Sequence, residues 1–273
     1  GDFATIQEAI NVAAPAETIV LADGVFSGPG NRDLDFLGKA ITVRSQSGDA
    51  ELCIIDCGGS ETESHRGFEL YSGESSSPVL ENVTSQGGWR TYGAGGRIES
   101  SSPTLRGIIF RDNIGTDGGG LIVGNGNPII EDCVFLNNSV TDAGGAIYLN
   151  TSFPQIIRCE FRNNSAYWGG GGLYNQHAAP NVLECTFEGN YSDHWGGAVH
   201  NRYQESGPLF TSCLFLENTS PQGAAGFNRD GTTPSFTSCS FVGNGSANGA
   251  VLRTRSESVT TFIRCLLVFS PEG

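Results

Sequence analysis

The sequence predicts an all-β protein, a parallel β-solenoid of roughly 10–11 coils with a short N-terminal capping helix. Three observations support this prediction. A block of about 26 residues recurs along most of the chain, apolar residues alternate within each block, and Asn and Gly residues return at fixed positions. Alternation is the period of a β-strand, and Asn and Gly favour turns. Each block is therefore expected to form one coil that pairs only with its neighbours.

The repeat can be aligned on a recurring proline, and successive prolines lie 25 to 28 residues apart. These prolines are Pro78, Pro103, Pro128, Pro154, Pro180, Pro208 and Pro234. Five residues later the column reads Val83, Ile108, Cys133, Cys159, Cys185, Cys213 and Cys239, and Cys265 continues it. Two residues further it reads Phe110, Phe135, Phe161, Phe187, Phe215 and Phe241, and then Leu267. Because the two columns are two positions apart, we expect both on the inward face of one strand.

An asparagine follows ten residues after most of these prolines. The column is Asn113, Asn138, Asn164, Asn190, Asn218 and Asn244. Asn tolerates left-handed backbone geometry and caps turns through its amide, so we expect these residues to form the turn after the strand. A glycine pair and a second short strand come next, as in "GGAIYL", "GGGLYN" and "GGAVHN". The pattern therefore predicts two strands in each coil.

The cysteines are expected to stack along the core as reduced, buried residues. Equivalent residues of neighbouring coils lie one β-spacing apart, about 4.8 Å. Stacked side chains run parallel, whereas a disulfide needs side chains directed toward each other. No histidine shares the column, which argues against zinc. Cys53 and Cys57 are four residues apart in an extended stretch, too far for a direct bridge.

The amino end has the pattern of a helix. In "TIQEAINVAA" the apolar residues Ile6, Ala9, Ile10 and Ala13 follow the helical period, Thr5 and Glu8 form a capping box, and Pro15 follows. We interpret residues 1–75 as this capping helix with irregular first coils, and residues 76–273 as regular repeats of one continuous domain. The last segment, "CLLVFSPEG", has no comparable cap. We therefore expect either further chain beyond it or end-to-end self-association.

Composition excludes some partners. The formal net charge is −14 and the only lysine is Lys39, so nucleic acid is not an expected partner, whereas divalent cations and neutral or cationic surfaces are. No apolar run approaches the roughly 18 residues of a membrane span, so membrane insertion is not expected. No signal peptide is recognisable, which is consistent with a mature or trimmed chain.

The alignment also places polar and aromatic residues in outward rows on the middle coils. One row contains Asp117, Asp142, Trp168 and His194, with Tyr167 and Trp195 beside it, and a second contains Tyr148, Tyr174 and His200, with Arg202 nearby. Aromatic rings of this kind can lie against sugar rings, so Tyr148, Tyr167, Trp168, Tyr174, His194, Trp195, His200 and Arg202 form a candidate carbohydrate patch.

Three other interpretations of these rows stay open. Asp117 and Asp142, one coil apart, are candidate calcium ligands together with loop carbonyls, although no cofactor is required by the sequence. The same two carboxyl groups could raise each other's pKa and act as an acid–base pair. Alternatively, all of these residues only form turns and stack to stabilise neighbouring coils.

The motifs "FLNNS…GGAIY" and "FRNNS…GGGLY" resemble the FxxN and GGA[ILV] repeats of polymorphic outer-membrane proteins. The opening "ATIQEAINVAA…TIVLADGVF…CIIDCGG" resembles the capped end of right-handed parallel β-helix proteins in the pectate-lyase-like superfamily. The resemblance implies a right-handed coil and an exported, extracellular or cell-surface protein. The catalytic motifs of the polygalacturonase-like and pectate-lyase-like enzymes are missing, so the resemblance supplies no catalytic residue.

The leading hypothesis is therefore an exported structural or interaction solenoid, such as a surface stalk, an adhesin segment or a fibre subunit, that contacts polysaccharide or a cell-surface glycan. The alternative is a carbohydrate-active enzyme, either a polysaccharide lyase or a glycoside hydrolase, or a carbohydrate-binding module. The missing catalytic motifs favour the first hypothesis.

Overall fold

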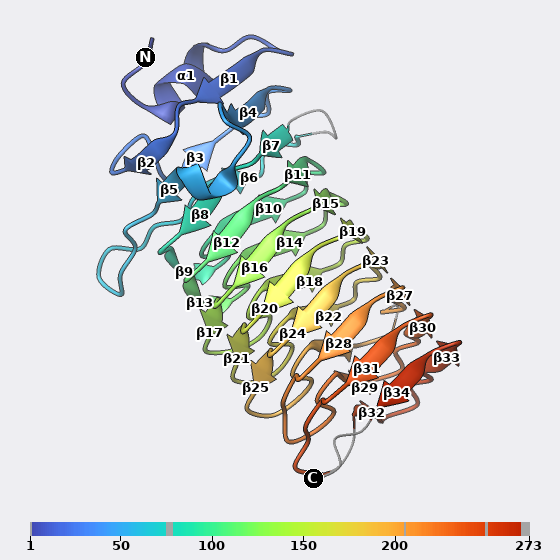
Figure 1. Ribbon diagram of the computed structural model, residues 1–273. Helices are drawn as coiled ribbons and strands as arrows, with labels where there is room; N and C mark the ends of the chain where they lie inside the picture. Colours follow the sequence, from blue (N-terminus) through green and yellow to red (C-terminus); the bar gives the residue numbers. More distant parts are fainter. Residues whose placement is uncertain (1, 75–78, 205, 249–250, 269–273) are drawn as a thin grey trace.

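The computed structural model describes residues 2–74, 79–204, 206–248 and 251–268, and it shows a parallel β-solenoid (Figure 1). Among these residues, two of the parallel sheets contain ten strands each and a third contains nine, so the stack makes about nine turns, slightly fewer than the 10–11 coils predicted. The coils stack in one row from helix α1 (Ile6–Val12) at one end to the last strands at the other. Pro78, the first proline of the repeat, and residues 269–273 of the predicted open end lie outside the described residues.

Four sheets run the length of the stack or part of it. Sheet A contains β1 (Thr18–Leu21), β4 (Thr42–Ser45), β7 (Val79–Glu81), β11 (Thr104–Arg106), β15 (Ile129–Glu131), β19 (Gln155–Ile157), β23 (Asn181–Leu183), β27 (Leu209–Thr211), β30 (Ser235–Thr237) and β33 (Thr261–Ile263). Sheet B contains β2 (Gly24–Ser27), β5 (Cys53–Asp56), β8 (Thr84–Gln86), β12 (Ile109–Arg111), β16 (Val134–Leu136), β20 (Glu160–Arg162), β24 (Thr186–Glu188), β28 (Leu214–Leu216), β31 (Ser240–Val242) and β34 (Leu266–Val268). A 3₁₀ turn, Ala50–Leu52, precedes β5.

The other two sheets form the side of the rod on which the candidate residues lie. Sheet C contains β3 (Leu34–Asp35), β6 (Phe68–Leu70), β10 (Gly96–Glu99), β14 (Leu121–Gly124), β18 (Ile147–Asn150), β22 (Leu173–Gln176), β26 (Val199–Arg202), β29 (Gly226–Arg229) and β32 (Leu252–Thr254). The short sheet D contains β9 (Trp89–Tyr92), β13 (Ile114–Asp117), β17 (Ser139–Val140), β21 (Ser165–Ala166) and β25 (Tyr191–Ser192).

The prediction of two strands per coil was wrong, because the cysteine and phenylalanine columns do not share a strand. The residue before each cysteine of the column from Cys133 onward adopts a left-handed backbone, as in Asp132 and Arg158 with φ of 54° and 50°. This bend ends the strand in sheet A and begins the strand in sheet B. Cys133 and Phe135 nevertheless both point inward and are fully buried. The core positions were therefore predicted correctly, although the corner between them was missed.

The core consists of stacked side chains, as the alignment predicted. The rings from Phe110 to Phe241 stack at centroid distances of 4.4 to 5.1 Å, with their planes nearly parallel.

All eight cysteines are free, and all except Cys265 are buried. Burial raises the pKa of Cys53 to about 11 and that of Cys57 to about 12, so these thiols stay protonated and unreactive at neutral pH.

The asparagine column forms a buried ladder. The left-handed residue of each turn is the one before the ladder asparagine, such as Asn137 or Asn163. The prediction that the ladder asparagines themselves form the turn was therefore wrong by one residue. Asn164 itself is fully buried, and its Nδ2 donates to the carbonyl of Phe135 and to Oδ1 of Asn190 at 2.9 and 3.0 Å. Each ladder amide thus joins a strand carbonyl of the preceding coil to the asparagine of the following coil.

Helix α1 begins as predicted. The Thr5 hydroxyl accepts a hydrogen bond from the Glu8 N–H at 3.2 Å, and the Glu8 carboxylate accepts one from the Thr5 N–H at 3.3 Å. Ile6 and Ile10 are buried against the first coils, so the helix covers one end of the core. No helix in the described ranges is long and apolar enough to cross a bilayer.

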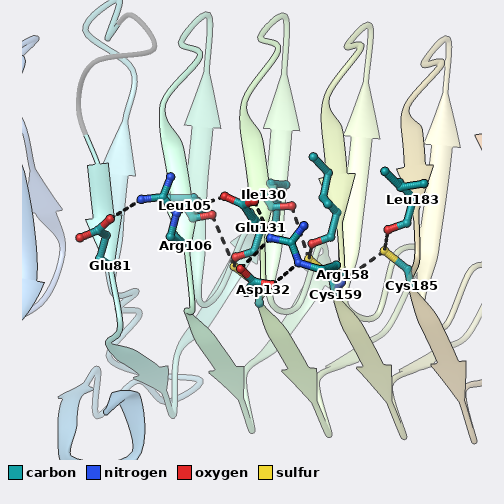
Figure 2. A network of polar contacts seen from close by, with 12 residues as sticks. Glu81, Leu105, Arg106, Ile130, Glu131, Asp132, Arg158, Cys159, Leu183 and Cys185 are labelled. Atoms are coloured by element: carbon teal, nitrogen blue, oxygen red, sulfur yellow. Dashed lines mark hydrogen bonds and ion pairs between the residues drawn. The ribbon is translucent and has the colours of Figure 1, made fainter. Parts of the chain in front are cut away.

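The outer face of sheet A carries a ladder of ion pairs (Figure 2). Arg106 bridges Glu81 and Glu131 at 2.5 and 3.1 Å, and Arg158 bridges Glu131 and Asp132 at 2.6 and 2.7 Å. The hydrogen bonds from Arg158 and Arg106 lower the pKa of Glu131. These partly exposed pairs join neighbouring coils, and pairs of this kind contribute little to stability.

Candidate functional site

The structure stacks the first predicted row on successive coils. Isolated β-bridges join Ala143 to Gly169 and Gly169 to Trp195, so the residues before them, Asp142, Trp168 and His194, lie one coil apart. The Trp168 N–H donates to the Asp142 carbonyl at 2.8 Å, and the Trp168 and His194 rings are 4.4 Å apart. The row therefore lies where sheet D turns toward sheet C.

The second predicted row lies on sheet C. Tyr148, Tyr174 and His200 are register partners in β18, β22 and β26. They are less exposed than predicted, since Tyr174 is only 4% and His200 only 1% exposed. The rings of Trp195 and Phe227 pack around His200 at centroid distances of 5.8 and 5.3 Å. The alternation of residues along the strand predicted that these side chains point away from the core. It did not predict the side chains of neighbouring coils that cover them.

A hollow of about 330 Å³ lies between the two rows. We call it the first hollow. Its lining consists of Asp142, Ala143, Trp168, Tyr174, Trp195, His200, Arg202 and Arg229. Trp168 and Trp195 stack at 5.4 Å with an angle of 28°, and Trp168 remains 40% exposed. Five residues of the predicted patch and one of the two predicted metal ligands thus meet around one concave surface.

The remaining candidates lie beside the first hollow. Tyr167 stacks on His194 at 4.7 Å, and its carbonyl lies 3.1 Å from Nδ1 of that histidine. Tyr167 also lines a separate depression of about 470 Å³ along sheet D. Tyr148 lies one coil before Tyr174, and its hydroxyl donates to Oε1 of Gln176 at 2.6 Å. These three residues border the first hollow without lining it.

Two charged residues of this region, Arg229 and Asp230, were missed. Arg229 is the register partner of Arg202 on the next coil, so extending that column by one repeat would have found it. One carboxylate oxygen of Asp230 accepts from Nε of Arg229 at 3.0 Å and from Nε of Arg202 at 3.4 Å. The Arg229 guanidinium also lies 4.7 Å from the centre of the Trp195 ring. Asp230 therefore holds both guanidinium groups at the edge of the first hollow.

His200 is a buried histidine whose two ring nitrogens have no hydrogen-bond partner. Burial, with the nearby charges of Arg229 and Arg202, moves the pKa of His200 well below its usual value, so the ring is neutral. Nδ1 packs on Gly169, where an added Cβ would approach it to 2.3 Å. A buried polar ring without a partner is unusual and marks this position as a candidate for ligand contact.

The structure places the predicted carboxyl pair one coil apart. Burial raises the pKa of Asp117 to about 6, the charge of Asp142 adds to this rise, and a hydrogen bond from the Ala143 N–H opposes it. Burial also raises the pKa of Asp142, while Arg202 opposes that rise. Among the described residues, no group of three or more His, Cys, Asp or Glu side chains is placed to hold a metal ion. Calcium binding by this pair together with loop carbonyls stays a prediction.

The raised pKa of Asp117 predicts a pH-dependent stability. An unfolded aspartate has a pKa of about 3.9, so between about pH 4 and pH 6 the folded protein binds more protons than the unfolded chain. Raising the pH through this window should lower the free energy of unfolding. In Asp117→Asn this contribution disappears, while the amide oxygen can still accept from Ala143. Thermal denaturation of both proteins across the window tests this, and parallel pH curves would contradict it.

The chain matches the family model described as "Right handed beta helix region" over residues 39–215 and belongs to that family. This match establishes the right-handed coil. Among solved structures, the fold is similar to that of "Pectin methylesterase from Yersinia enterocolitica", with a TM-score of 0.52 and 9% sequence identity. The similarity covers 97% of this chain and 90% of that one, and at this identity it shows the fold alone. A comparison with curated proteins found no match.

Proposed function

We propose that this protein is an exported β-solenoid that contacts carbohydrate through the first hollow. The observation that carries the proposal is the pairing of Trp168 and Trp195 on one side of the hollow with Arg202, Arg229 and Asp142 around it. Sugar rings offer apolar faces for stacking and hydroxyl groups for hydrogen bonding, and this arrangement supplies both kinds of contact. The buried, neutral ring of His200 packs against Trp195 and lines the same hollow.

The surroundings of the hollow support the same proposal. The solenoid gives it a stiff base, because every coil pairs with its neighbours along sheets A, B and C. The named structural neighbour acts on pectin, a polysaccharide, although the similarity to it shows only the fold. The resemblance to polymorphic outer-membrane repeats favours a cell-surface or extracellular setting, where a surface stalk or adhesin segment would meet glycans.

Retention on affinity gels tests this function. Gels would contain pectin, de-esterified pectin or a neutral glucan, and the wild-type chain should be retarded by at least one of them. Trp168→Ala and Trp195→Ala should each weaken retention by about tenfold, which is the effect expected for one lost ring contact. The matched control is Tyr71→Ala, a half-exposed ring on an early coil that should not affect retention. If no glycan retards the wild-type chain, the proposal is wrong.

A second candidate function is hydrolysis of the bound polysaccharide by Asp117 and Asp142. The observation that favours it is the raised pKa of both carboxyl groups, since Asp117 at about 6 could hold a proton near neutral pH. Release of new reducing ends from a retained polysaccharide would support this function. The variant Asp117→Asn, at a residue that does not line the first hollow, should then lose the release while keeping retention on the gel.

A further inference from the structure

A second hollow lies beside the first, at the end of the same strands. It has a volume of about 480 Å³, and its lining includes His177, Tyr203, Gln204, Asp230 and Glu257. The His177 and Tyr203 rings stack almost parallel, 4.7 Å apart, and form a rigid wall. The carboxylates of Asp230 and Glu257 and the amide of Gln204 provide hydrogen-bonding groups for hydroxyls. No part of the predicted patch lies in this hollow.

Arg202 connects the two hollows. It lines the first, while its guanidinium lies 4.4 Å from the centre of the Tyr203 ring and its Nε donates to Asp230, both of which line the second. The first hollow alone is at the small end of ligand sites, which span roughly 300–1,000 Å³. The two together lie near the upper end of that range. Their combined size fits several units of a chain better than a single sugar.

We propose that the two hollows are consecutive subsites for an oligosaccharide that runs along the strand direction of sheet C, across the long axis of the rod. This inference rests on the proposed carbohydrate function and assigns the direction of the ligand chain. From Trp195 through His200 to Arg202 and Tyr203, the contact residues follow β26 and the turn after it. Arg202 and Asp230 lie at the junction, where they would contact the linkage between neighbouring units.

The competing direction is parallel to the rod. A chain on that path would leave the first hollow along the row of Asp142 and Asp117 toward Tyr92, the register partner of Asp117 in β9. Tyr92 is 52% exposed and lines neither hollow, which makes it a suitable reporter for the axial path. Tyr203 reports on the path across the coils. Substitutions of Tyr92 and Tyr203 therefore distinguish a ligand that runs along the rod from one that runs across it.

Binding of oligogalacturonides of increasing length, from the disaccharide to the hexasaccharide, tests the inference by calorimetry, with cello-oligosaccharides as a neutral series. The key variant is Tyr203→Asn, because φ at this position is 71° and Asn tolerates that conformation. We expect affinity of the wild-type chain to rise with length. Tyr203→Asn should weaken binding of the longer oligomers by about tenfold, close to the contribution of one good contact, and leave the disaccharide unchanged.

Each outcome of this experiment has a definite meaning. Tyr92→Ala should leave both series unchanged. If Tyr92→Ala removes the gain with length and Tyr203→Asn does not, the chain lies along the rod and the inference is wrong while the carbohydrate function stands. If the wild-type chain binds but its affinity does not depend on oligomer length, the inference is also wrong while the carbohydrate function stands. If neither series binds the wild-type chain and the affinity gels also show no retention, the function and the inference fail together.

Discussion

Asn164→Ala should destabilise the solenoid by about 3 kcal/mol or more, because each buried polar group left without a partner costs about 1–3 kcal/mol. The amide of Asn164 makes four contacts. Besides its two donor bonds, its Oδ1 accepts from the backbone N–H and from Nδ2 of Asn138 at 3.0 and 2.9 Å. Without it, the Phe135 carbonyl and the Asn138 N–H lose partners inside the core. The Nδ2 of Asn138 keeps its bond to Phe110.

The matched control is Asn163→Gly, one residue earlier. Asn163 is exposed and left-handed, with φ of 53°, so glycine fits there and the change should stay within about 0.5 kcal/mol. Urea denaturation gives the free energies of unfolding, and hydrogen exchange at the Asn138 amide reports the local loss. Similar stabilities for the two variants would show that the ladder contributes nothing beyond filling space.

Gly169→Ala should both distort the first hollow and destabilise the stack of coils. A Cβ at this position would lie 2.3 Å from Nδ1 of His200 and 2.7 Å from the carbonyl oxygen of Trp195. The carbonyl belongs to the backbone of the next coil and cannot retreat without separating two strands. We expect a loss of about 1–3 kcal/mol, typical of an overpacked core. Displacement of His200 and Trp195 should also weaken glycan binding by about tenfold or more, as expected when one good contact is lost.

Gly245→Ala is the control for this substitution. Gly245 lies three coils later, in the column of Ser165, Tyr191 and Thr219, and the nearest atom to an added Cβ there is the Thr219 hydroxyl at 4.0 Å. Stability and glycan retention of this variant should match the wild-type chain. The interpretation of Gly169 would be wrong if Gly169→Ala folded and bound glycan as well as Gly245→Ala does.

The fold was predictable because each coil repeats the same local signals. Periodic burial identified Cys133 and Phe135 as core residues, and the Thr5–Glu8 pattern identified the cap of α1. The corner at Asp132 was missed, because only some residues at this position, such as Gly107 and Asp132, favour a left-handed backbone, whereas Arg158 does not. The hydrogen bonds of the neighbouring coils impose that conformation, so only the stacked structure reveals it.

The candidate site was predictable in part for a similar reason. Alignment of the coils brought Trp168 and His194 together, because equivalent positions stack in register. The burial of His200 depends on side chains of the next coil, and the pairing of Arg202 with Arg229 through Asp230 requires both coils to be considered together. These features come from packing between coils, which a single repeat does not encode.

A crystal structure grown with the glycan that the affinity gels retain most strongly would show whether the first hollow holds sugar. We expect a sugar ring against Trp168 or Trp195, with hydroxyl groups within hydrogen-bond distance of Asp142 and Arg202, and with the chain continuing past Arg202 toward Tyr203. A glycan bound on another face of the solenoid, with the first hollow empty, would contradict the account.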